Sequence, residues 1–143
     1  MNKFLTDTEM ASLVEAIQTA EDCSTGEIRI HIDSNTETDN AKMAFEVFQT
    51  LCKGKTAERN AVLFHINFEQ KYLTIIGDEG IHEKVHQDFW NQLHDHITSE
   101  FAKGNYYTAL KNAVLETGKE LKKFFPVING NNPNELPNEI TFS

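Results

Sequence analysis

Residues 55–81 read KTAERNAVLFHINFEQKYLTIIGDEGI, and this stretch decides the fold of the chain. Two apolar runs, residues 61–66 and 72–76, have the length and β-branched content of strands, and the short polar break between them allows a hairpin. The outer ends of the two runs are polar and carry Glu58, Arg59, Asn60, Asp78 and Glu79. Because antiparallel neighbours run in opposite directions, these ends should meet at one edge of a sheet.

The composition is that of a single globular domain, with 143 residues of which 39% are apolar and 24% charged. The formal net charge of −9 disfavours nucleic acid and anionic membranes as partners and favours cations. Cys23 and Cys52 lack metal-site spacing and are predicted to be free thiols in a reducing compartment. We predict a cytoplasmic location, because no apolar run has the length of a signal peptide or a membrane span.

The pattern outside the opening stretch predicts a βαβ unit and further helices. Residues 28–32 alternate apolar and polar side chains like a strand, and residues 41–51 have the apolar period of a helix, so the first two strands should be parallel. A capping box at residues 6–9 predicts an N-terminal helix. Two more apolar stripes, residues 89–101 and 107–125, predict helices in the C-terminal half.

These elements together predict an α/β fold, a three-layer α/β/α sandwich in which about four helices flank a small mixed sheet. Gly118 lies on the apolar stripe of the last helix and indicates close packing there. The domain should span residues 1–128. Residues 129–143 are rich in Asn and Pro and are predicted to form a surface or disordered C-terminal tail.

The predicted topology brings Glu27, at the start of the first strand, to the same polar edge of the sheet. Carboxylate and amide oxygens are the ligands that Ca²⁺ and Mg²⁺ prefer, so this edge is a candidate cation site. Its predicted metal ligands are Glu27, Asn60, Asp78 and Glu79, with Glu58 in second rank. The alternative interpretation is a salt-bridged turn in which Arg59 pairs with Asp78.

A weaker candidate lies at the opposite edge of the sheet, where Asp33 and Asp39 are second-rank metal ligands. Their loop has the alternating polar pattern of a calcium loop, but it lacks the glycine and the terminal glutamate of an EF-hand.

The sequence has no motif of a nucleophilic or phosphate-binding enzyme: there is no Gly-x-Ser-x-Gly, phosphate-binding loop or Cys-x5-Arg loop. Hydrolysis would therefore have to be metal-assisted. Histidines 82, 86, 94 and 96 do not match a zinc motif and are predicted to be exposed on a helix. His65 falls inside the central strand and is predicted to be a core histidine with its hydrogen bonds satisfied.

Several short motifs in a fixed order resemble the TPM domain family, which includes a thylakoid-lumen acid phosphatase, a photosystem II repair protein and an acetylcholine-receptor modulator. They are Thr25-Gly26-Glu27-Ile28, Lys55-Thr56, Arg59-Asn60-Ala61-Val62-Leu63 and Gly77-Asp78-Glu79-Gly80-Ile81, followed by Phe101, Gly104 and Tyr107. The C-terminal Phe125-Pro126 and Asn134-Glu135-Leu136-Pro137-Asn138 resemble small stand-alone members from marine flavobacteria.

The resemblance implies an α/β/α sandwich and binding of divalent ions, calcium in particular, at Glu27, Asn60 and Asp78. Plant relatives are phosphatases, but Glu58-Arg59-Asn60 departs from the acidic-Asn-Gly form of many relatives. Three hypotheses stay open: a calcium-binding protein with an accessory or assembly role, a metal-assisted acid phosphatase, and an ion-independent protein-interaction module. The expected partners are divalent cations (Ca²⁺ or Mg²⁺) and, in the third hypothesis, a protein.

Overall fold

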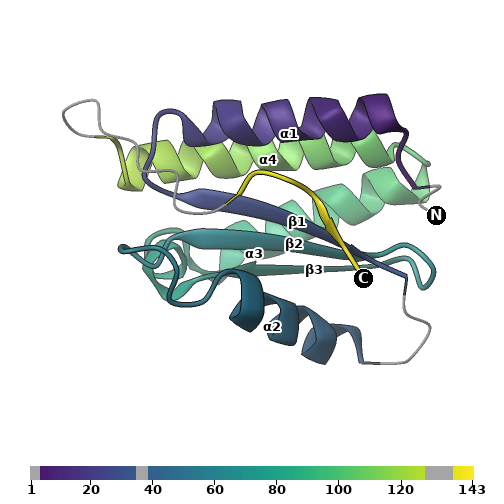
Figure 1. Ribbon diagram of the computed structural model, residues 1–143, viewed down its shortest axis with the longest axis horizontal. Helices are drawn as coiled ribbons and strands as arrows, with labels where there is room; N and C mark the ends of the chain where they lie inside the picture. Colours follow the sequence, from purple (N-terminus) through teal and green to yellow (C-terminus); the bar gives the residue numbers. More distant parts are fainter. Residues whose placement is uncertain (1–3, 35–38, 128–136) are drawn as a thin grey trace.

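A computed structural model describes residues 4–34, 39–127 and 137–143 of the chain. Within them, helices on both faces cover a mixed four-stranded sheet with strand order β3-β2-β1-β4 (Figure 1). The helices are α1 (Asp7–Glu21), α2 (Asn40–Leu51), α3 (Glu79–Ala102) and α4 (Tyr106–Phe124), and the strands are β1 (Glu27–Asp33), β2 (Ala61–Asn67), β3 (Tyr72–Gly77) and β4 (Thr141–Phe142). The predicted α/β fold class is confirmed.

The centre of the sheet is the predicted βαβ unit. β1 and β2 pair in parallel from Glu27 opposite Ala61 to Asp33 opposite Asn67, and α2 forms the crossover between them. β3 returns antiparallel to β2 after a short connection. Every residue of β1 and β2 is buried, because helices cover both faces and a strand lies on either side of each.

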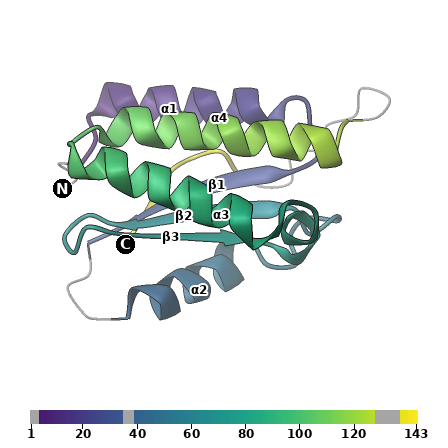
Figure 2. The same ribbon diagram turned by 180° about the vertical axis from the view of Figure 1, so that it is seen from behind.

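The two faces of the sheet differ in chemistry. Helices α1, α3 and α4 cover one face, and α2 covers the other (Figures 1 and 2). The first face is the main apolar core, to which β1 contributes Ile28, Ile30 and Ile32. The second has only a small apolar cluster, centred on Phe48 and Leu63. Strand alternation places the polar residues of β1 on this second face, so the α2 side of the sheet is where buried polar groups collect.

The helix boundaries follow from capping and close packing. Thr6 and Glu9 form the predicted capping box of α1. Asp78 is the N-cap of α3, so this helix begins directly after β3, and it kinks at His86, where φ is 65°. The close packing indicated by Gly118 is present, because a Cβ at this position would lie 2.6 Å from the Ala20 Cβ of α1.

The short strand β4 was not predicted. Thr141 and Phe142 pair in parallel with His31 and Ile32 of β1, and so add a fourth strand to the sheet. The first residues of the predicted tail, up to 136, lie outside the described part of the chain. In the part that is described, no helix is both long and apolar enough to cross a membrane.

Candidate functional site

The polar ends of β1, β2 and β3 lie together at one edge of the sheet, as their directions require. Glu27 pairs with Ala61, which follows Asn60, and Val62 pairs with Gly77, which precedes Asp78. Asn60 is thereby placed between the first residue of β1 and the N-cap of α3. We call this region, made of Glu27, Asn60 and Asp78, the edge site.

Backbone hydrogen bonds hold the edge site together. The Glu27 amide donates to the Asn60 carbonyl at 3.4 Å, and the Asp78 amide donates to the Ala61 carbonyl at 2.9 Å. The Gly80 amide donates to the Arg59 carbonyl at 2.7 Å. A Cβ on Gly80 would lie 2.2 Å from the Glu58 carbonyl oxygen, so only glycine allows the first turn of α3 to approach this loop so closely.

Two buried acceptor oxygens at the edge site have no hydrogen-bond donor in the described part of the chain. Asn60 is completely buried, and its Nδ2 donates to the Thr25 hydroxyl at 3.1 Å, while its Oδ1 has no partner among the described residues. Asp78 Oδ1 accepts from the Glu79 amide at 2.8 Å, and its Oδ2, also buried, has no partner there. A buried acceptor without a donor costs about 1–3 kcal/mol, so both oxygens are suited to a cation.

The other predicted ligands are already engaged. Glu79 forms an exposed ion pair with Arg59, so the salt bridge considered for Asp78 forms with its neighbour instead. Glu58 accepts a hydrogen bond from the Thr25 hydroxyl. Glu27 is buried and hydrogen-bonded to the Glu21 carboxyl. Of the predicted set, Asn60 and Asp78 therefore offer free acceptor oxygens.

The second-rank residues of the opposite edge have separate roles. Asp39 is the N-cap of α2 and accepts from the Lys42 amide at 3.0 Å. Asp33 is buried, and its Oδ2 lies 3.4 Å from His65 Nε2. Neither residue is near the edge site. Asp33 ends the strand that Glu27 begins, and Asp39 starts the helix that follows this strand.

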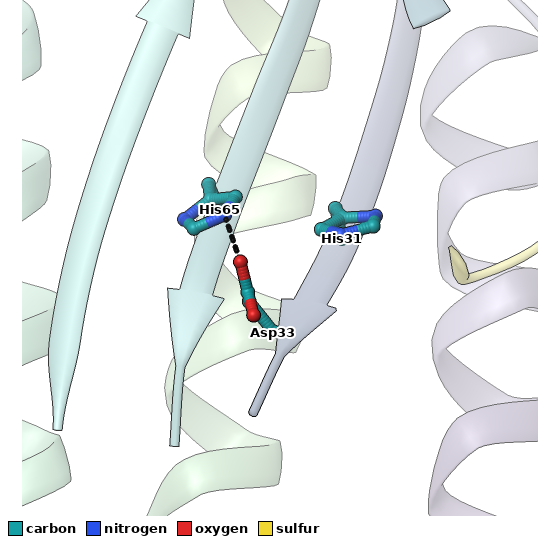
Figure 3. A group of neighbouring side chains, drawn as sticks. All are labelled: His31, Asp33 and His65. Carbon is teal, nitrogen blue, oxygen red and sulfur yellow. Dashed lines mark ion pairs between the residues drawn. The ribbon is translucent and has the colours of Figure 1, made fainter. Parts of the chain in front are cut away.

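Asp33 belongs to a second group of candidate ligands on the α2 side of the sheet. His31, Asp33 and His65 each offer an atom within 4.8 Å of the others, and all three are buried (Figure 3). The parallel register pairs His31 with His65, and their rings stack with centroids 5.5 Å apart. We call these three residues the histidine group.

The surroundings of the histidine group keep both imidazoles neutral. Burial, followed by the charge of His65, lowers the pKa of His31 to about 4. Burial also lowers the pKa of His65, against the opposing effect of the Asp33 carboxylate. His31 Nδ1 and Nε2 lie 2.7 Å from the hydroxyls of Thr141 and Ser143 respectively, so the C-terminal strand holds this ring.

Comparison with known proteins identifies the family. The TPM domain model matches residues 1–120. The chain belongs to the TPM domain family. The structure is similar to the NMR structure of the BA42 protein from the psychrophilic bacterium Bizionia argentinensis, with 35% identity, a TM-score of 0.89, and coverage of 100% of this chain and 98% of that one. The predicted family membership is confirmed.

A more distant neighbour of this TPM domain shows a likeness of fold. It is the N-terminal domain of a protein from P. gingivalis, with 15% identity, a TM-score of 0.68, and coverage of 85% of this chain and 78% of that one. No curated protein matches the chain.

The histidine group of this TPM domain was missed by sequence reasoning. His65 is a core histidine as predicted, but the prediction that its hydrogen bonds are satisfied is wrong, since neither ring nitrogen makes a hydrogen bond within the described residues, and the contact of Nε2 with Asp33 is an ion-pair contact at 3.4 Å. A signal was present in the sequence. His31 and Asp33 are two apart on one strand and so share a face, and the predicted parallel pairing places His65 on the next strand.

Proposed function

We propose that this TPM domain binds a divalent cation of the calcium class at the edge site and has an accessory or assembly role. The observation that carries the proposal is the pair of buried oxygens, Asn60 Oδ1 and Asp78 Oδ2, which have no hydrogen-bond donor among the residues that the structure describes. Calcium takes carboxylate, amide and carbonyl oxygens, which are the donors present here. The family resemblance and the net charge of −9 support the same choice.

Glu27 is the third residue that we assign to this site. Its backbone amide bonds to the Asn60 carbonyl, so the first residue of β1 is joined to the residue that carries one of the two oxygens. The raised pKa of the neighbouring Glu21 carboxyl, about 9, means that Glu21 keeps its proton at neutral pH and can donate it to Glu27. Glu21 then adds no second negative charge to the site.

The test is a Ca²⁺ titration of the protein, followed by backbone amide chemical shifts, for the wild type and Asp78→Asn. We expect saturable shifts at residues 27, 60 and 78–80 in the wild type. We expect at least a tenfold weaker affinity in the variant, or about 1.4 kcal/mol, because the substitution removes the negative charge of a carboxylate ligand. Asparagine is as good an N-cap as aspartate, so α3 should stay intact.

A matched control is Asp39→Asn, because Asp39 is also the N-cap of a helix but lies at the other end of the sheet. Its calcium affinity should equal that of the wild type. The proposal fails if the wild type shows no saturable shift at millimolar Ca²⁺, or if both variants weaken binding equally. An aryl phosphate assay on the same samples separates binding from catalysis: turnover that disappears in Asp78→Asn would replace this proposal with the metal-assisted phosphatase.

A further inference from the structure

His65 is a buried side chain whose ring nitrogens form no hydrogen bond within the described residues, and its Nε2 has only the Asp33 carboxylate 3.4 Å away there. It is 1% exposed, and neither Nδ1 nor Nε2 makes a hydrogen bond to the described residues. Its neighbour on β3, Thr74, also has a buried hydroxyl that makes no hydrogen bond to any described residue. A neutral imidazole has one donor and one acceptor, and leaving such groups unpaired costs about 1–3 kcal/mol each. In the described part of the chain, the carboxylate of Asp33 is close to His65 Nε2 without forming a hydrogen bond to it, which leaves this nitrogen available to a bound ion.

The spacing of the histidine group fits a metal ion of small radius. Zinc–nitrogen and zinc–oxygen bonds of about 2.0–2.1 Å in a tetrahedron place neighbouring ligand atoms roughly 3.3 Å apart. Asp33 Oδ2 and His65 Nε2 are already 3.4 Å apart. The ligand atom of His31 lies within 4.8 Å of the other two, so a modest approach of this ring completes a three-ligand site.

The donor set selects the class of metal. Two imidazole nitrogens and one carboxylate suit zinc and its neighbours, whereas calcium and magnesium prefer sites made of oxygen. An imidazole binds a metal ion in its uncharged form. The carboxylate of Asp33 supplies the negative charge.

We propose that His31, Asp33 and His65 bind a transition-metal ion of the zinc class, at a site distinct from the edge site. The two sites lie at opposite ends of β1, with Glu27 at its first residue and Asp33 at its last. Three protein ligands leave the fourth position of a tetrahedral ion to a water or a hydroxyl. The ion satisfies the nitrogen of His65 that faces Asp33.

The C-terminal strand lies next to this site. A cavity of about 320 Å³ between α2 and β4 is lined by His31, Val47 and Thr141 among others, and it gives an ion a route to the histidine group. Each ring nitrogen of His31 is hydrogen-bonded to a different hydroxyl of the C-terminal segment. Metal binding exchanges one of these hydrogen bonds for a metal–nitrogen bond, and the other continues to orient the ring.

The test is a Co²⁺ titration of the calcium-saturated protein, followed by displacement with Zn²⁺. We expect one equivalent of Co²⁺ to give the visible absorption of a four-coordinate ion and Zn²⁺ to remove it. With Zn²⁺, the imidazole ¹⁵N signals of His31 and His65 and the amide of Thr141 should shift. Saturation with Ca²⁺ beforehand keeps the edge site from contributing to the result.

Two variants test the ligands, and a third is the control. His65→Gln and Asp33→Asn each remove one ligand, and we expect affinity to fall by more than the roughly 10- to 100-fold loss caused by removing an outer-shell partner. His96→Gln removes an exposed histidine of α3 and should leave the affinity unchanged. Asp78→Asn should also bind Zn²⁺ normally, so failure of the calcium proposal leaves this result unaffected.

The main competitor is a buried water bridging His65 and Asp33. The wild type alone distinguishes it, which covers the case in which a variant does not fold. Imidazole signals of His31 and His65 that stay in place at saturating Zn²⁺, with a long-lived water contact to His65, would overturn the proposal. Equal loss of Co²⁺ binding in His96→Gln and His65→Gln would overturn it as well, because the ion would then be bound by surface histidines.

Discussion

Glu21 is a buried carboxyl whose environment favours its protonated form. It ends α1, accepts from the Ile28 amide at 2.7 Å and is hydrogen-bonded to Glu27. Burial first, and the hydrogen bond and charge of Glu27 next, raise its pKa from 4.5 to about 9. Nothing in the sequence distinguishes Glu21 from an ordinary helix glutamate. Its protonation is set by burial and by neighbours that folding brings to it.

The raised pKa of Glu21 predicts that stability falls with rising pH. Between pH 4.5 and about 9 the folded state holds a proton that the unfolded state has released. Its contribution is complete below pH 4.5 and is lost as the pH rises towards 9, with a slope of up to about 1.4 kcal/mol per pH unit.

The measurement is the free energy of unfolding by urea from pH 5 to pH 9, in the presence of a chelator. Glu21→Gln should flatten this pH dependence and be more stable than the wild type at pH 8. The exposed Glu15→Gln on the same helix is the control and should keep the wild-type profile. A wild type and Glu21→Gln with parallel profiles would contradict the prediction.

At the scale of elements, the contact between α1 and α4 depends on two small residues. Gly118 of α4 faces Ala20 of α1, and a Cβ at position 118 would lie 2.6 Å from the Ala20 Cβ and 3.1 Å from its carbonyl oxygen. Neither helix can move away freely, because both also pack on the apolar face of the sheet.

Gly118→Val should therefore destabilise the protein by about 1–3 kcal/mol, the usual cost of overpacking a core. The measurement is the urea midpoint at constant m-value. The swapped pair Ala20→Gly with Gly118→Ala tests the cause, because it moves the methyl group from one helix to the other. It should be more stable than Gly118→Ala alone. Additive effects of the two substitutions would show that the contact is not the reason.

At the scale of the whole molecule, the C-terminal segment completes the sheet. β4 pairs with β1, and its Thr141 hydroxyl and that of Ser143 are hydrogen-bonded to the ring of His31. The backbone of Ser143 also bonds to Ile32 and Ser34. A segment more than a hundred residues away in the sequence thereby becomes part of the surroundings of the histidine group.

Thr141→Val with Ser143→Ala should leave the buried His31 nitrogens without partners. We expect a loss of about 1–3 kcal/mol in unfolding free energy and faster hydrogen exchange of the β4 amides. Ser99→Ala, at an exposed position of α3, is the control and should change neither quantity. Unchanged stability and exchange in the double variant would show that these hydroxyls do not hold the strand.

The prediction of the fold and of the edge site depended on local patterns of apolar and polar residues in the sequence. The alternation of residues 28–32, the apolar run of 61–66 and the helical period between them were enough to orient β1 and β2. Strand direction then brought Glu27, Asn60 and Asp78 to one edge. β4 was missed because two residues are too few for a periodic signal, and they pair only because β1 offers a free edge.

The sequence by itself determined the α/β class, the order and direction of the three long strands, and which polar residues share an edge, because these follow from periodicity and chain direction. Only the tertiary structure decided which polar atoms there lack partners. It also decided that the two histidines and Asp33 lie close together in a buried environment. Hydrogen bonding, burial and pKa depend on contacts between segments distant in sequence, and those contacts exist only once the chain is folded.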